Sequence, residues 1–190
     1  MSLVVALLFQ ADIEVSVYAG QAWTLDGDVK VGGRTTRDVD WDDESFRSPI
    51  YYGIRASVYR ERWGLGLDFF HAKVYLDDAV EGLDEFAMSH GYNVVTANVL
   101  HRWPGGTLTP YGGAGLGAVV AHVEANAGAE RTSEYQLAGP AVHGLAGLAF
   151  GPVFVEAKAA YAWIETDTAG GAVKTALATP QIVAGLTLRF

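Results

Sequence analysis

Apolar and polar residues alternate along most of this chain, and the last ten residues, QIVAGLTLRF, show the pattern clearly. One face of this segment carries Ile182, Ala184, Leu186, Leu188 and Phe190, and the other carries Gln181, Val183, Gly185, Thr187 and Arg189. A period of two predicts a β-strand with one apolar face. A final strand with apolar side chains outside, small or polar ones inside and an aromatic last residue is typical of a transmembrane β-barrel. Its terminal ring would lie in the membrane interface.

Seven further segments alternate in the same way. They cover residues 12–23, 49–59, 64–75, 92–103, 108–123, 135–150 and 153–163. Their connections alternate in length, because long polar stretches near 24–47, 76–90, 124–133 and 164–172 are separated by short turns near 61–63, 104–106 and 151–152. Outer-membrane barrels have short periplasmic turns and longer outer loops. The sequence therefore predicts an all-β fold, an eight-stranded antiparallel up-and-down transmembrane β-barrel, with both chain ends on the periplasmic side.

The other face of these strands carries charged and polar side chains. They are Asp12, Glu14, Arg55, Asp68, Asn98, Arg102, Glu156, Lys158 and Arg189. An eight-stranded barrel is just wide enough for side chains to fill it, and an unpaired buried ion costs several kcal/mol. We therefore expect these charges to pair in a polar core without a pore. Trp63 and Trp103 fall at short turns and Trp23 and Trp163 at the opposite strand ends, which predicts two aromatic girdles.

Composition narrows the choice of protein class. The chain has 190 residues, enough for one domain, and half of them are apolar, yet no run of eighteen or more residues is continuously apolar, which excludes a helical membrane protein. A net charge of −9 argues against a nucleic-acid partner. The absence of cysteine excludes disulfides and a thiolate zinc site. Leu3 to Phe9 is a short apolar run, so we expect residues 1–11 to be a signal-peptide remnant and residues 12–190 to form the barrel.

Residues able to carry chemistry gather at the predicted outer rim, level with lipopolysaccharide head groups. They are His71, Lys73, His122, Glu124, Glu134 and Gln136. If Leu65, Leu67 and Phe69 face lipid, His71 and Lys73 continue on that face, where a lysine supplies charge for a phosphate and a histidine exchanges protons. His71, His122 and Glu124 also offer suitable ligands for a divalent metal. The alternative is that these side chains only solvate the interface, as a snorkelling lysine does.

Several segments resemble the outer-membrane lipid A oxidase family over about residues 12–142. They are SPIYYGIRAS (48–57), LGLDFFHAKVY (65–75), YNVVTANVLHRWP (92–104), LTPYGGAGLGAVVAHVE (108–124) and EYQLAGPAV (134–142), of which HAKVY and HVE are the most specific. The resemblance implies an enzyme that oxidises the proximal glucosamine of lipid A to an aminogluconate unit, with molecular oxygen as co-substrate. Combined with rim position, it selects the same six residues as catalytic candidates, with Lys73 or a neighbouring arginine on a phosphate and His71 or His122 moving a proton. A divalent metal is a candidate cofactor.

Two other interpretations stay open at this point. The chain could be a non-catalytic barrel of the small OmpA or OmpX type, serving envelope integrity, adhesion or recognition through its outer loops. A soluble lipocalin-like barrel would need the opposite pattern, apolar inside and polar outside. The lipid A oxidase and the non-catalytic barrel would both lie in the bacterial outer membrane, with lipid and lipopolysaccharide as partners, and both would be monomers.

Overall fold

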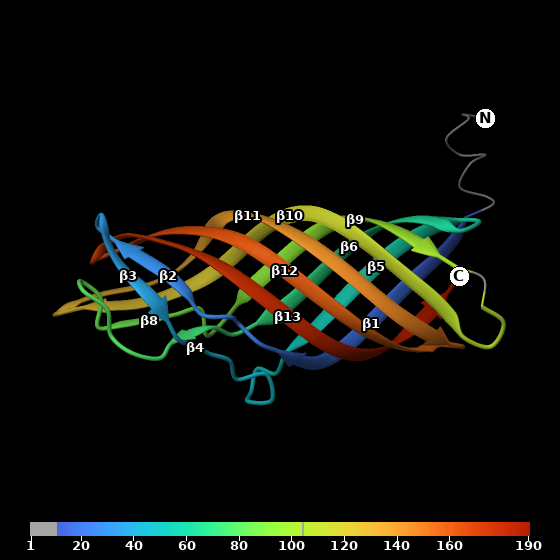
Figure 1. Cartoon of the computed structure of the whole chain (residues 1–190), viewed down its shortest axis with the longest axis horizontal. Helices are drawn as coiled ribbons and strands as arrows, with labels where there is room; N and C mark the ends of the chain where they lie inside the picture. Colours follow the sequence, from blue (N-terminus) through green and yellow to red (C-terminus); the bar gives the residue numbers. More distant parts are fainter. Residues whose placement is uncertain (1–10, 104) are drawn as a thin grey trace.

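The computed structural model describes residues 11–103 and 105–190, and eight long antiparallel strands in it form a closed ring (Figure 1). They are β1 (Asp12–Ala22), β5 (Tyr52–Arg60), β6 (Trp63–Ala72), β9 (Tyr92–Arg102), β10 (Thr109–Ala127), β11 (Glu130–Phe150), β12 (Val153–Thr168) and β13 (Gly171–Arg189). The last strand pairs with the first, Val17 lying opposite Leu186, and this pairing closes the ring. The predicted eight-stranded up-and-down barrel is confirmed. The predicted signal-peptide remnant and Pro104 of the predicted turn lie outside the described residues, apart from Ala11.

Within the described ranges, no helix is long and apolar enough to cross a membrane.

The two ends of the barrel differ, as the connection lengths predict. Tight turns join β5 to β6 and β11 to β12 at the end where the C-terminus lies (Figure 1). The opposite end carries two long connections, which contain β2 (Gly27–Val31), β3 (Arg34–Val39), β4 (Trp41–Asp42), β7 (Tyr75–Leu76) and β8 (Glu85–Ala87). Of these short strands, β2 pairs with β13 and β8 pairs with β10, so the wall continues beyond the main ring.

Two of the four predicted long connections are wrong. Residues 124–133 and 164–172 lie mostly in strands, because β10 and β11 pair as far as Ala127 and Glu130, and β12 and β13 as far as Thr168 and Gly171. Beyond the bilayer the apolar face changes sides: Val123 and Val173 are buried inside, whereas Glu124 and Lys174 face outward, so the outward apolar face that marked a strand ends while the backbone pairing continues. The β10–β11 and β12–β13 hairpins therefore extend beyond the segments that the sequence pattern predicts as strands.

The outer wall of the ring is apolar. Leu65, Leu67 and Leu116 have relative exposures of 68%, 62% and 70%, values that are costly in water and ordinary against lipid. The four tryptophans predicted to form girdles, Trp23, Trp63, Trp103 and Trp163, are also exposed. This is the surface of a membrane-spanning barrel, and it excludes the lipocalin-like interpretation.

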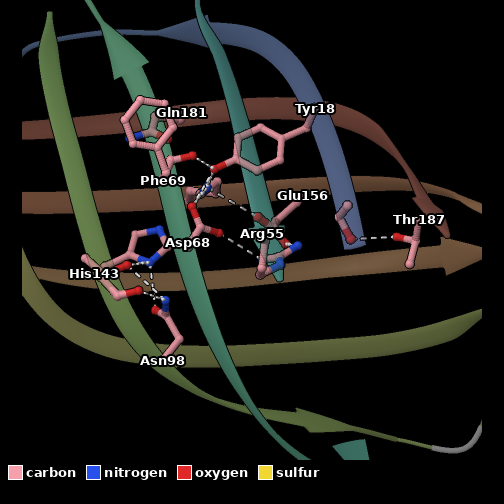
Figure 2. Close-up of polar contacts among 12 residues, drawn as sticks. Tyr18, Arg55, Asp68, Phe69, Asn98, His143, Glu156, Gln181 and Thr187 are labelled. Atoms are coloured by element: carbon pink, nitrogen blue, oxygen red, sulfur yellow. Dashed lines mark hydrogen bonds and ion pairs between the residues drawn. The ribbon is translucent and has the colours of Figure 1, made fainter. Parts of the chain in front are cut away.

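The middle of the barrel is filled by a charge-balanced cluster (Figure 2). Asp68 accepts from the Lys158 ammonium at 3.0 Å and lies 3.4 Å from the Arg55 guanidinium, which also donates to Glu156 at 2.8 Å. Two cations thus neutralise two carboxylates, and Tyr18 adds a hydrogen bond to Asp68. The predicted pairing of inward charges is confirmed for these residues.

A second group of ions lies toward the short-turn end. Glu14 bridges Arg102 at 2.9 Å and Arg189 at 2.7 Å, as expected for inward-facing charges. The prediction that Asp12 belongs to the buried, paired charges is wrong, because this side chain is exposed at the start of β1. The strand begins at Asp12, so its side chain reaches solvent.

The interior of the outer half is apolar. Phe70, Tyr92, Val119 and Leu177 are at most 1% exposed, and the cluster continues into the long connections through Phe86. The predicted polar filling is therefore confined to the middle and the short-turn end. The extended hairpins and folded connections enclose enough apolar side chains to form a conventional core above the ions.

Replacing Arg55 with Met should destabilise the folded barrel by about 3–5 kcal/mol, because Glu156 and Asp68 lose a buried partner. Arg34→Met is the matched control, since Arg34 and Glu81 form an exposed pair worth at most about 1 kcal/mol. Urea unfolding in lipid vesicles, followed by tryptophan fluorescence, measures both changes. Equal effects of the two substitutions would contradict the proposed role of the buried cluster.

Leu67→Arg should also destabilise the barrel, by about 2–4 kcal/mol, because Leu67 faces out from the middle of β6 toward the bilayer centre. The same change at Phe150, at the short-turn end of β11, should cost about 0–1 kcal/mol. The same unfolding assay distinguishes the two positions. A larger loss at Phe150 would be inconsistent with this placement of the membrane.

Candidate functional site at the outer rim

A hollow of about 330 Å³ opens at the end of the barrel that carries the long connections. Its walls come from the connection after β1, the segment from β6 to β9, and the outward face of β10. The ionisable side chains in these walls include Glu44, Arg47, Lys73, Tyr75, His90 and Glu124. The hollow therefore joins two of the predicted site residues, Lys73 and Glu124, to others.

The register of β10 determines which of its side chains reach the outside. Val119, Ala121 and Val123 are fully buried in the apolar interior, so the alternating residues His122 and Glu124 face outward. Buried valine and alanine on one face thus hold the imidazole and carboxylate on the other.

A glycine next to β9 brings a second histidine to the same place. The pairing of β9 with β10 ends at Tyr92, and the preceding residue, Gly91, has a φ of 147°. A side chain is strained there, and a Cβ would lie 2.1 Å from the Asn93 side-chain nitrogen. The turn places Ser89 and His90 beside Glu124.

His90, His122 and Glu124 form a compact cluster, with ligand atoms within 4.8 Å of one another. The Glu124 Oε1 atom lies 3.2 Å from His90 Nδ1 and 3.8 Å from His122 Nδ1, and Ser89 donates to the other carboxylate oxygen. His122 packs edge-on against Tyr135, with ring centroids 4.7 Å apart. Its buried Nδ1 has no hydrogen-bond partner in the described part of the chain. Two imidazoles and a carboxylate are a suitable donor set for zinc and related divalent ions.

Lys73 does not face outward at the level of the head groups, as was predicted. Its side chain is 5% exposed, and its ammonium donates to the backbone carbonyls of Arg47 and Ser48 at 3.0 and 3.1 Å. The connection after β1 folds over the end of β6 and covers it. Lys73 therefore fixes this connection, and Arg47, whose side chain is 77% exposed, is the accessible cation of the hollow.

Two neighbours of Lys73 have shifted pKa values. Burial, with the nearby Glu44 carboxylate as the next cause, raises the pKa of Tyr75 to about 12. The hydrogen bond from Arg47 holds the pKa of Glu44 below its ordinary value. At neutral pH the hollow thus contains a neutral phenol and an ionised carboxylate that partly balances Arg47 and Lys73.

His71 lies outside the hollow. It shares the outward register of Phe69, but Tyr52 stacks on its ring at 5.2 Å, its Nδ1 is 2.9 Å from the Asn93 side-chain oxygen, and it is 5% exposed. The predicted exposure of His71 is wrong because its cross-strand neighbours cover it. Of the metal set proposed from sequence, His122 and Glu124 come together, and His90 takes the place of His71.

Glu134 and Gln136 occupy the opposite face of the same wall. They pair with Val123 and Ala121, which face inward, and cross-strand partners share a face. Gln136 bonds to Glu134 and to the backbone of Asp167. The structure therefore separates these two predicted residues from His122 and Glu124, and the catalytic role of all six stays a prediction.

His90, Ser89, Arg47 and Tyr75 are the additional residues of the cluster and hollow. His90 and His122 are separated by an entire strand, and no local spacing connects them. The only sequence signal was the number of histidines and glutamates near one predicted rim.

No protein-family model matches the chain, and no curated protein matches it in sequence. Among solved structures, Neisserial surface protein A aligns over 95% of this chain and 97% of its own length, with a TM-score of 0.52 and 14% identity. The outer membrane protein OprG from Pseudomonas aeruginosa aligns over 94% of this chain and 96% of its own, with a TM-score of 0.50 and 13% identity. At these identities the likeness shows the fold: the chain is a small β-barrel of the outer-membrane type. This agrees with the predicted location in the bacterial outer membrane.

Binding of Zn²⁺ to the detergent-folded protein, measured by isothermal titration calorimetry, tests the ligand set. His122→Ala and His90→Ala should each weaken binding at least about tenfold, and acidification should weaken it further because protons compete for imidazole. His71→Ala is the control and should leave the affinity unchanged. If His71→Ala weakens binding and His90→Ala does not, the cluster described here is not the metal site.

Proposed function

We propose that this chain is an outer-membrane enzyme that oxidises the proximal glucosamine of lipid A, with the rim hollow as its site. The observation that supports this most directly is the outward-facing cluster of His90, His122 and Glu124 at the outer end of a membrane-spanning wall. Groups in this position meet the sugar–phosphate region of outer-leaflet lipids. The resemblance of HAKVY and HVE to the lipid A oxidase family supplies the reaction type.

The proposed reaction converts the ring hemiacetal of the sugar to a lactone. The anomeric carbon loses its hydrogen, the anomeric hydroxyl loses its proton, and the two electrons and two protons reduce one O₂ to hydrogen peroxide. Water then opens the lactone to the aminogluconate, so the lipid gains one oxygen atom overall. Glu124 or His122 accepts the hydroxyl proton, and a divalent ion held by the cluster would supply Lewis acidity.

The surrounding residues hold the substrate in this proposal. Arg47 is exposed and suits a phosphate, whereas the ammonium of Lys73 is already hydrogen-bonded to two carbonyls. Lys73 thus acts by positioning the connection that carries Arg47. Lipid A is the partner, and the barrel works as a monomer.

A non-catalytic barrel is the second candidate, and the hydrogen bonding of the rim favours it. Ser89 binds both Glu124 and His90, so the cluster also serves to tie the connection before β9 to β10. In that case the histidines would stabilise long connections that recognise a partner.

Mass spectrometry of lipid A that carries a free anomeric hydroxyl, after incubation with the detergent-folded protein and oxygen, distinguishes the two candidates. The wild-type protein should yield a product one oxygen atom heavier, and His122→Ala and Glu124→Gln should each lower the rate at least about 100-fold. His101→Ala is the control, since His101 packs between Trp63 and Trp103 at the other girdle. An unchanged lipid A spectrum with the wild-type protein would refute the oxidase proposal.

A further inference from the structure

The outer face of β11, β12 and β13 carries a trough in two joined parts. The part nearer the rim has a volume of about 980 Å³, and the part nearer the barrel centre about 490 Å³. Both are lined by Tyr161 and Ala178, so one continues into the other. The trough lies on the wall that faces the bilayer, outside the rim hollow.

Beside the rim part of the trough, the backbone pairing of β11 with β12 is interrupted. Their pairing ends at Ala141 and Ala162. The next residue, Pro140, has no N–H to donate, and Gly139 before it has a φ of 140°. A Cβ at Gly139 would lie 2.0 Å from the Trp163 carbonyl oxygen, so only glycine permits this path.

Nearer the rim the gap closes again through side chains. The Gln136 amide donates to the Asp167 carbonyl at 2.7 Å and accepts from the Asp167 N–H at 2.8 Å. The Ala169 N–H donates to the Thr132 hydroxyl at 2.9 Å. The interruption of the pairing is therefore bounded at both ends, and the two strands stay side by side along it.

Polarity changes along the trough in the way that an amphiphile requires. The charged side chains of the rim part are Asp26, Asp28, Lys30 and the exposed pair of Lys174 and Glu165, whose charged atoms are 2.5 Å apart. The inner part is almost wholly apolar, with Leu25, Val142, Gly144, Ala159 and Pro180 among its lining residues. Trp163, a residue of the outer girdle, lies in the rim part, so the charged end is level with head groups and the apolar end with hydrocarbon.

The outward face of β11 leads from the histidine cluster to the trough. Tyr135 packs against His122 of the cluster, and Leu137, two residues further on the same outward face, lines the trough. A molecule with its sugar at the cluster would therefore have an acyl chain within reach of this groove.

We propose that the trough binds an acyl chain of the lipid A molecule whose sugar enters the rim hollow, so that the hollow and the trough together favour lipid A over other outer-membrane lipids. This inference rests on the proposed function for the identity of the lipid. The trough aligns the chain beside β12, and the charged rim meets the polar part of the same molecule. Binding, unlike oxidation, needs neither oxygen nor a metal.

Native mass spectrometry of the detergent-folded protein with purified lipid A, and phosphatidylethanolamine as competitor, tests the trough. Ala178→Phe fills the point that both parts share and should weaken lipid A retention at least about tenfold, because excluding about two CH₂ groups suffices. Ala184→Phe is the matched control, since Ala184 is an exposed alanine of the same strand outside the trough, and retention should not change. Gel mobility before and after boiling confirms that both variants are folded.

Three results would overturn the inference. They are unchanged retention in Ala178→Phe, an equal loss in Ala184→Phe, and equal retention of phosphatidylethanolamine and lipid A by the wild-type protein. The proposed oxidase function is tested separately, by measuring the oxidised lipid A product. Selective lipid A retention without any product would uphold the trough and reject the reaction, whereas normal oxidation by Ala178→Phe with unchanged retention would reject the trough alone.

Discussion

The pairing of β1 with β13 is the contact on which the rest of this structure depends. In a bilayer no water is available to satisfy an exposed backbone N–H or C=O, so a sheet can cross only if it has no free edge. Nine residue pairs, from Glu14–Arg189 to Ala22–Gln181, join the first strand of the ring to the last. Closure makes each strand two-sided, with lipid on one face and the packed interior on the other. The alternation in the sequence is the consequence of this geometry.

Closure also explains the chemistry of the interior. A ring of eight strands leaves a narrow space, so Arg55, Lys158, Asp68 and Glu156 are buried and pair with one another. Interior aromatic rings fit by lying over glycines on neighbouring strands, as Tyr18 does at Gly53. The interior is thus a scaffold, and the outward surfaces are where the barrel can meet other molecules.

Both candidate binding surfaces arise where the regular barrel is interrupted. At the rim, Gly91 turns the chain so that His90 reaches Glu124. On the wall, Gly139 and Pro140 interrupt the pairing of β11 with β12 beside the trough. Departures from a regular pattern, rather than the pattern itself, therefore mark the places at which this protein can be specific.

The sequence by itself determined the eight strands, the direction of most side chains in the ring, the pairing of inward charges and the two girdles, because the period of two and the demands of lipid act on each strand locally. It did not determine the extended hairpins, since outside the bilayer the outward face of a strand is polar and the apolar face that marked the strands ends. Only the tertiary structure decided that His90 joins His122 and Glu124, that Lys73 is covered, and that Gln136 faces the other side of the wall. Those outcomes depend on strand register and on how the connections fold back over the rim, which involve residues far apart in the chain.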